Sequence, residues 1–421
     1  MAISAQVKTA VAVTISAIAI NTTTTAFAYS NQFCIRAGEY TPGGFAYVDR
    51  NVGNKWTSTA SRPLRGVHVV VKNNNTLIFS GSADQVGCTP DLTMSQGTFQ
   101  LNVYSWGYPL YPTTSTALQI RNNTTGPAAY EIRTMNGTVG SSWTKYVDPL
   151  ENSTQDIWFL YAAAAETLHD EPVSGLFKLL YNRYILAAYT TSGTTSIGYR
   201  SARNRFTIAH ELGHQYMDIA NEAVINSASY AETGCISNCP ESCRSALTPN
   251  GGGLADCVHK LTSNEYMTAA FVEGWANYVA AKIWNTTSSC FWPQYNLETK
   301  SYTGVNCWLG TPEYPANYIR WKCEPSCTSS SSSDCLSHGV ELDWLRTFWR
   351  TGGSQNCGGT IPAWLAVFAD ITIGLTLDPC NAFEQLDSRV AGTPFEACWT
   401  SAAGGNGINR PSGTCNPPMC R

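Results

Sequence analysis

The spacing of apolar and polar positions changes once along the chain, near residue 146. Before that point, short runs rich in β-formers are separated by polar segments; they cover 66–71, 76–81 and 98–106. In the last run Phe99, Leu101 and Val103 alternate with more polar neighbours. One buried face and one solvated face produce this alternation. The regular spacing of the runs predicts an all-β sandwich over residues 29–145.

After residue 146 the apolar positions take a helical period. The first expected helix covers 153–170, which is alanine-rich, opens with a Ser/Thr cap candidate and lacks glycine and proline. Further helices are expected over 204–223, 264–284, 339–350 and 362–373. Two segments rich in cysteine, glycine or serine, 235–257 and 323–335, interrupt them as loops. The expected fold is therefore multidomain and disulfide-rich, with a β-sandwich followed by a mainly α (α+β) domain over 146–421 that carries a Cys-rich insert at 235–257.

The first 28 residues are typical of a secretory signal peptide. One lysine precedes a short apolar run, and Ala26, Phe27 and Ala28 form an A-x-A cleavage site. We expect cleavage near Ala28 and a secreted, extracellular or periplasmic chain. No later run is long enough to predict a membrane span.

The cysteine content agrees with export. The chain has 16 cysteines, an even number, which in an oxidising compartment indicates disulfides. Cys34 and Cys88 are the only two before residue 230. If each domain closes its own bridges, these two cysteines pair with each other.

Charge excludes two classes of partner. Charged residues are 13% of the chain and the formal net charge is −4, without a basic cluster. Nucleic-acid binding and attraction to an anionic membrane both require such a cluster, so neither is expected.

Residues 206–222 contain His210, Glu211 and His214 in the spacing H-E-x-x-H. On a helix, positions i and i+4 share a face, so both imidazoles can reach one ion while Glu211 lies at the edge of that face. Catalytic zinc needs a third protein ligand and an open position. Asp218 extends the histidine stripe by one more turn of the helix, but it would have to fold back, so it is expected only behind the ligands.

A downstream segment, "FVEGWANYVA" (271–280), places Glu273 and Asn277 one turn apart on an expected second amphipathic helix. Together with "HELGHQYM", it resembles the zinc-binding motifs of gluzincin metallopeptidases, in particular the aminopeptidase N-like group and their thermolysin-like relatives. The resemblance implies a zincin-like domain with Zn²⁺ ligated by His210, His214 and Glu273, and with Asn277 accepting a hydrogen bond from a ligand histidine. Glu265 is the alternative third ligand.

The spacing departs from that family. Gluzincins usually place far fewer residues between the second histidine and the glutamate, whereas here 58 intervene (215–272). Four cysteines in this insert can form disulfides that hold it, so that the second helix still docks. The strands before residue 106 resemble a second family, the prealbumin-like sandwiches attached to secreted hydrolases, through "RGVHVVV", "FSGSADQVGCTPDL" and "GTFQLNVYS".

These residues predict metal-assisted hydrolysis of a peptide or protein substrate. Zinc would activate its bound water and Glu211 would act as general base. By analogy with thermolysin-like enzymes, His338 would donate a hydrogen bond to the developing oxyanion. Tyr314 and Tyr318 are alternative donors. His338 could equally serve as a cap of the helix that follows it. The segment 194–200 would form the sheet edge that pairs with an extended substrate.

Three hypotheses remain open from the sequence. The first is an exported zinc metallopeptidase. No G-x-M-E-N-like run precedes the zinc helix, which favours an endopeptidase over an aminopeptidase and leaves an unassigned exopeptidase open. The second is a non-enzymatic surface adhesion or binding protein with a structural zinc site. The third is a latent enzyme whose cleft is covered by the β-domain or the Cys-rich insert.

Overall fold

The computed structural model describes residues 28–37, 62–123, 129–147, 149, 155–185, 188–191, 193–199, 201–202, 205–226, 264–284, 295–296, 301–302, 338–352, 357–371, 379–405 and 408. The expected signal peptide, apart from Ala28, and the Cys-rich insert 235–257 lie outside these residues.

Thirteen of the described strands precede the H-E-x-x-H helix. They are β1 (Ala28–Ala37), β2 (Arg62–Pro63), β3 (Val67–Asn73), β4 (Thr76–Ser82), β5 (Leu92–Ser95), β6 (Gly97–Gly107), β7 (Thr116–Asn122), β8 (Ala129–Tyr130), β9 (Ile132–Val139), β10 (Trp143–Val147), β11 (Gly175–Asn182), β12 (Ala188–Thr191) and β13 (Thr194–Gly198). The three runs expected to be strands are thus confirmed as β3, β4 and β6.

The helices and the short later strands follow. The helices are α1 (Gln155–Asp170), α2 (Arg205–Asn226), α4 (Met267–Trp284), α7 (Glu341–Gly352), α8 (Ile361–Ala369), α9 (Pro379–Val390) and α10 (Glu396–Gly405). The strands are β14 (Asn264–Tyr266), β15 (Tyr295–Asn296), β16 (Ser301–Tyr302) and β17 (His338–Val340). Each of the five expected helices has a counterpart here, although β14 and β17 replace the expected first residues of two of them.

The N-terminal part is β-rich, as the alternation predicted. Two sheets form it: β10, β1, β2 and β5 in one, and β3, β4, β6 and β9 within a larger nine-stranded sheet. Phe33 of β1 meets Phe99 of β6 edge to face, with ring centroids 5.1 Å apart, and Trp143 of β10 contacts both rings. Burial of the inward-facing positions of β3 and β6 between the sheets accounts for the period of two.

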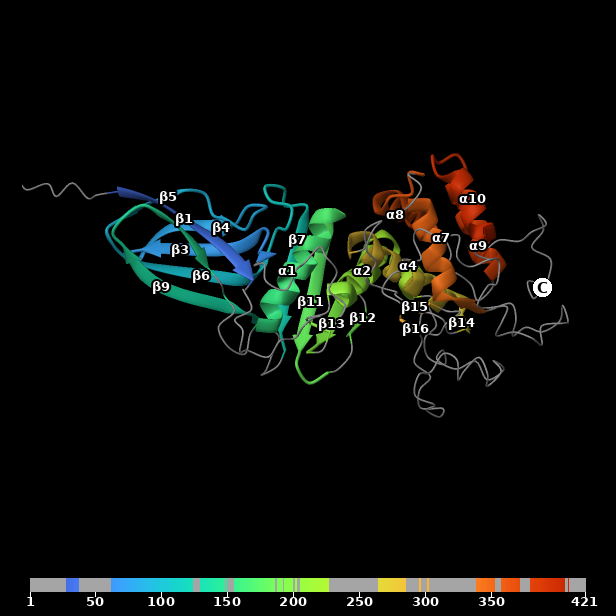
Figure 1. Ribbon diagram of the computed structural model, residues 1–421, viewed down its shortest axis with the longest axis horizontal. Helices are drawn as coiled ribbons and strands as arrows, with labels where there is room; N and C mark the ends of the chain where they lie inside the picture. Colours follow the sequence, from blue (N-terminus) through green and yellow to red (C-terminus); the bar gives the residue numbers. More distant parts are fainter. Residues whose placement is uncertain are drawn as a thin grey trace, which may run out of the picture.

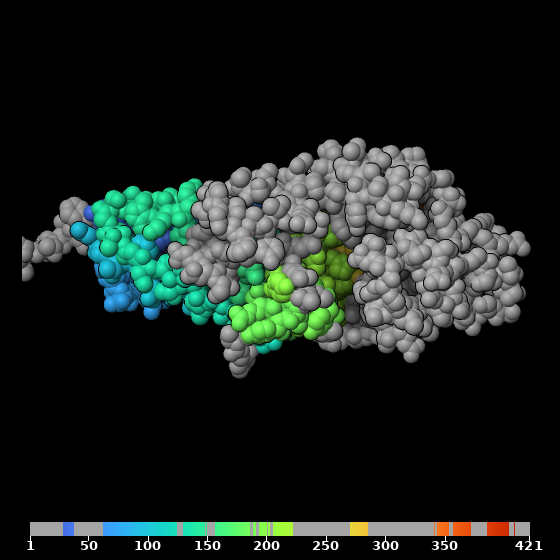
Figure 2. All heavy atoms as spheres, turned by 60° about the horizontal axis from the view of Figure 1, so that its bottom comes forward, coloured from blue at the N-terminus to red at the C-terminus, as the bar shows by residue number. Residues whose placement is uncertain are grey.

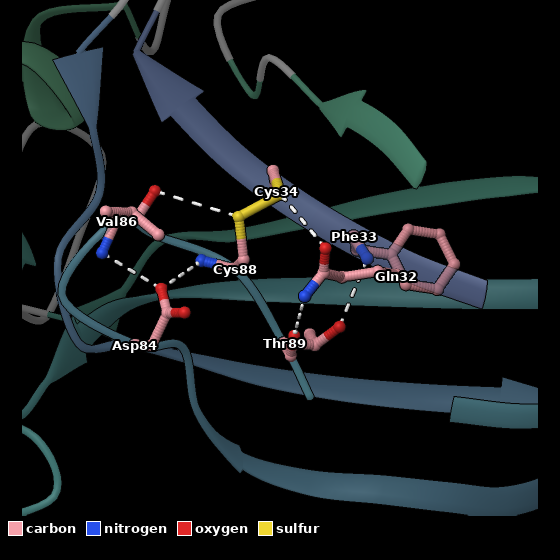
Figure 3. Close-up of a disulfide and its surroundings, with 7 residues drawn as sticks. All are labelled: Gln32, Phe33, Cys34, Asp84, Val86, Cys88 and Thr89. Carbon is pink, nitrogen blue, oxygen red and sulfur yellow. Dashed lines mark hydrogen bonds between the residues drawn. A yellow bond between two sulfur atoms is a disulfide. The ribbon is translucent and has the colours of Figure 1, made fainter. Parts of the chain in front are cut away.

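The predicted Cys34–Cys88 disulfide is confirmed and links β1 to the loop after β4 (Figure 3). The neighbouring backbone is held by side chains: Asp84 Oδ1 accepts hydrogen bonds from the N–H groups of Val86 and Cys88, at 2.9 and 2.7 Å. Thr89 Oγ1 accepts from the N–H of Phe33 at 3.1 Å. A second disulfide, Cys357–Cys398, joins the segment before α8 to α10.

The nine-stranded sheet continues across the expected boundary at residue 146. Its order is β12-β13-β11-β7-β6-β3-β4, and β7 pairs in parallel with β11 over seven residues (Figure 1). Helices α1 and α2 pack on it through residues of β11: Tyr181 donates to Asp156 of α1 at 2.7 Å, and Phe177 meets Tyr216 of α2 edge to face. A single sheet therefore contains strands from both sides of residue 146. The division into two domains at this residue stays a prediction.

An aromatic core lies between α4, α7 and α8. Trp275 of α4 packs against Phe348 of α7 and Phe368 of α8, with centroids 5.4 and 4.8 Å apart. Every described side chain of α4 up to Ala281 is buried. The expectation of an amphipathic helix here was therefore wrong: neighbours cover this helix on all sides, which explains its high apolar content. Among the described residues, no helix is long and apolar enough to span a bilayer.

Candidate metal centre

Helix α2 carries both histidines of the H-E-x-x-H motif on one face. Ile208, Leu212 and Tyr216 occupy the opposite side and are completely buried, so the helix is fixed in rotation about its axis. Ile219, farther along the helix, is 42% exposed. His210 and His214 are thereby directed together, with their ring planes 89° apart.

Helix α4 crosses α2 at Gly213. A Cβ atom at this position would lie 2.8 Å from Ala276 Cα and 3.2 Å from Val279 Cβ, closer than side chains normally approach. Trp275 Nε1 also donates to the Gly213 carbonyl at 3.0 Å. The two helix backbones therefore pack closely at this glycine. It brings Glu273, one turn before Asn277, against the two histidines.

His210, His214 and Glu273 form a group that can hold a metal ion. His210 Nε2 lies 3.2 Å from His214 Nε2 and 3.0 Å from Glu273 Oε2, while His214 Nε2 lies 3.4 Å from Glu273 Oε1. Ligands at about 2.0–2.2 Å from a tetrahedral ion lie about 3.3–3.6 Å from one another. The three donor atoms therefore stand close to the separations that one small cation requires.

The other nitrogen of His210 is held by a side chain of α4. Its Nδ1 lies 2.8 Å from Asn277 Oδ1, and Asn277 Nδ2 donates to Glu341 Oε2 at 2.9 Å. An amide oxygen can only accept, so Nδ1 carries a hydrogen, and Nε2 is the nitrogen whose lone pair becomes available to an ion once its own proton is lost. Both Asn277 and Glu341 are buried.

The electrostatics of the group suit a cation. Burial alone would lower the pKa of His210, but the hydrogen bond and charge of Glu273, with the charges of Glu211 and Glu341, raise that pKa to about 9. Burial would likewise raise the pKa of Glu273; the charge of His214 and hydrogen bonds from both histidines instead hold it well below its usual range. Surroundings that retain positive charge on an imidazole also favour a divalent ion.

Glu211 is buried beside the group, and strand β12 holds its carboxylate. Thr190 Oγ1 donates to Glu211 Oε2 at 2.7 Å and lies 2.7 Å from Thr195 Oγ1 of β13. Gln215 Nε2 donates to Thr195 Oγ1 at 2.7 Å and to the Lys178 carbonyl at 2.8 Å. Since the amide must donate, the hydroxyl hydrogens point in turn toward Glu211, and this chain of hydrogen bonds fixes its rotamer.

Not every residue singled out from the sequence joins the group. Asp218 is outside it and lies near Gly193, in the turn between β12 and β13. His338 lies in β17, where it pairs with Tyr266 of β14 in the antiparallel ladder. Helix α7 starts only at Glu341. The side chains of His338 and Glu265 lie outside what the structure describes, as do Tyr314 and Tyr318. The roles predicted for these residues stay predictions.

The sheet edge near the group is β12, not segment 194–200 as expected. β13 pairs with β11 on one side and with β12 on the other, so among the described strands β12 is the outermost. A four-residue antiparallel strand directly before β13 supplies this edge, and so short a run gives too weak an alternation to be recognised in the sequence. Figure 2 shows the residues coloured for α2 set back beside the lighter green strands that precede them.

Three side chains were missed by the sequence analysis: Glu341, Thr190 and Gln215. Each acts through contacts with residues of another element, and none belongs to a local motif. An acid near the start of the expected helix 339–350 was the one available signal. The chain matches no protein-family profile and no curated protein.

Proposed function

We propose that the chain is an exported zinc-dependent metallopeptidase that hydrolyses peptide bonds within a polypeptide substrate. The observation that carries this proposal is the convergence of His210 and His214 from one helix and Glu273 from another at separations of 3.0–3.4 Å. Two imidazoles and one carboxylate are a donor set that catalytic zinc uses in hydrolases.

The same geometry favours a catalytic over a structural zinc site, which was the alternative. Structural zinc is usually closed by four protein ligands, whereas the group in the described part of the chain has three. The His210 side chain is 16% exposed, against 5% for Glu273, so solvent can approach from the histidine side.

Zinc bound there would polarise the substrate carbonyl and lower the pKa of a water molecule. Glu211 would take a proton from the attacking water and pass it to the leaving amine. Thr190 holds Glu211 Oε2 at 2.7 Å, which leaves Oε1 for this transfer and keeps the carboxylate in place. The outer edge of β12 would pair with an extended substrate backbone beside this carboxylate.

The proposal includes export of the chain to an oxidising compartment. The Cys34–Cys88 and Cys357–Cys398 disulfides fit an oxidising compartment. The signal sequence over 1–28 would deliver the chain there.

Glu211→Ala tests the proposed function. The variant should retain bound zinc but lose about 10²–10⁴-fold in casein hydrolysis, because a general base contributes about that much. Glu396→Gln is the control, since it removes an exposed carboxylate from α10 and should change neither quantity. Zinc content by elemental analysis and cleavage before and after chelation are the readouts. Unchanged hydrolysis in Glu211→Ala would exclude Glu211 as the base, and a wild-type chain that binds zinc yet cleaves no peptide would favour the structural site.

A further inference from the structure

Glu341 lies behind the metal group, and two hydrogen bonds link it to Nδ1 of His210, the ring nitrogen that faces away from the group. The chain of contacts runs from Glu341 Oε2 to Asn277 Nδ2 at 2.9 Å, and from Asn277 Oδ1 to His210 Nδ1 at 2.8 Å. We propose that Glu341 is a positioning residue that orients the Asn277 amide and thereby presents the His210 Nε2 lone pair to the metal. The inference rests on the metal centre of the proposed function.

The direction of each hydrogen bond follows from donor and acceptor chemistry. An ionised carboxylate only accepts, so Glu341 requires the NH₂ group of Asn277 on its side. The amide oxygen then faces His210 and accepts the hydrogen of Nδ1. An asparagine alone could turn over and offer its NH₂ group to the ring, which would place the imidazole hydrogen on Nε2 and abolish ligation. Glu341 removes that alternative.

The position of Glu341 depends on a close helix contact. A Cβ atom at Gly274 of α4 would meet the Trp344 side chain and would lie 2.8 Å from the Glu341 carbonyl and 3.1 Å from Leu345 N. The absence of a side chain at Gly274 therefore lets the first turn of α7 approach α4, one turn from Asn277. Phe271 of α4 and Trp344 of α7 pack edge to face in the same helix contact, with ring centroids 4.9 Å apart.

A simpler role for Glu341 is stabilisation of the helix start. An acid in the first turn of α7 interacts favourably with the positive end of the helix dipole. Asp343 lies in the same first turn and is also buried, whereas the carboxylate that accepts from Asn277 belongs to Glu341. Asp343→Asn is therefore the matched control for a helix-start effect.

The experiment exchanges the amide and the carboxylate along the chain of contacts. Glu341→Gln, Asn277→Asp, the double variant and Asp343→Asn are compared with the wild-type full-length protein. Zinc dissociation constants come from competition with a chromophoric chelator, and thermal unfolding of the metal-free proteins reports the fold. Glu341→Gln should weaken zinc binding by about 10- to 100-fold, the usual effect of losing a residue behind a metal ligand.

The double variant distinguishes positioning from a merely structural role. Asn277→Asp alone places two carboxylates against each other, and their repulsion should weaken zinc binding as well. In the double variant the carboxylate introduced by Asn277→Asp accepts from His210, and the amide introduced by Glu341→Gln donates to that carboxylate. Both hydrogen bonds are thereby restored, so zinc affinity should return to near the wild-type value.

Three results would overturn the inference. The first is an unchanged zinc affinity in Glu341→Gln, and the second is a double variant that binds no better than Glu341→Gln. The third is an equal loss in Asp343→Asn, which would assign the effect to the helix start. If the wild-type protein binds no zinc, the zinc centre of the proposed function is refuted, and the positioning role of Glu341 is refuted with it.

Discussion

The close contact of α2 and α4 at Gly213 can be tested by mutation. This contact brings Glu273 of α4 to the two histidines of α2. We expect Gly213→Ala to weaken zinc binding, although the added methyl group would press against Ala276 and Val279 of α4, which are not ligands. On helix propensity alone, the added methyl group should stabilise α2 by up to about 1 kcal/mol. The structure predicts the opposite effect, because the new Cβ would lie 2.8 Å from Ala276 Cα.

The size of the effect follows from that distance. Carbon atoms pack at about 3.5–4.0 Å, so α4 must shift by about 1 Å to accept the methyl group. Overpacking of this kind costs about 1–3 kcal/mol, which cancels or exceeds the gain in propensity. Metal–ligand distances tolerate only about 0.2 Å of change. A shift that carries Glu273 away from His210 and His214 should therefore lower zinc affinity by at least about tenfold.

Chelator competition and thermal unfolding measure the two quantities. Gly140→Ala is the control, because no atom lies within 4 Å of a Cβ built there and its site is a surface bend far along the chain from the ligands. A Gly213→Ala variant that is more stable than the wild type and binds zinc equally well would refute the argument. It would mean that Glu273 reaches the histidines without a close approach of the helix backbones.

Two further predictions concern His210 of the metal group and the contacts of Glu211. Because zinc needs neutral imidazoles and the pKa of His210 is raised to about 9, the ion must displace a proton at lower pH. Apparent zinc affinity should therefore rise by about tenfold per pH unit from pH 6.5 toward 9 and then level off; a flat profile in chelator competition would contradict it. Thr190→Val removes the hydrogen bond to Glu211 and should reduce peptide turnover by about 10- to 100-fold, the equivalent of about 1.5–3 kcal/mol, with zinc affinity unchanged. Thr190→Ser should keep most of the activity, and a fully active valine variant would show that the hydroxyl is dispensable.

Local sequence determined part of the secondary structure and the two histidines of the candidate site. Runs of β-forming residues marked β3, β4 and β6, with a clear period of two in β6, and helix-forming stretches marked α1, α2, α4, α7 and α8. His210 and His214 needed no tertiary information, because helix geometry alone places i and i+4 on one face. The Cys34–Cys88 pairing followed from there being no other partner in that part of the chain, and the structure confirms it.

Glu273 was a different case, since its selection depended on a resemblance of "FVEGWANY" to known zinc motifs. The 58 residues that separate it from His214 carry no information about where α4 docks. The docking follows from packing at Gly213 and from the aromatic core around Trp275, and both depend on residues of other elements.

The remaining features were decided only when distant segments came together. Pairing of β7 with β11 joins strands about sixty positions apart, and Glu341 reaches Asn277 across 64 positions. Sequence period reports which face of an element is buried, but it does not report which other element covers that face. Hydrogen bonds such as Thr190–Glu211 and Glu341–Asn277 are set by side-chain positions in the packed protein, so only the tertiary structure could identify them.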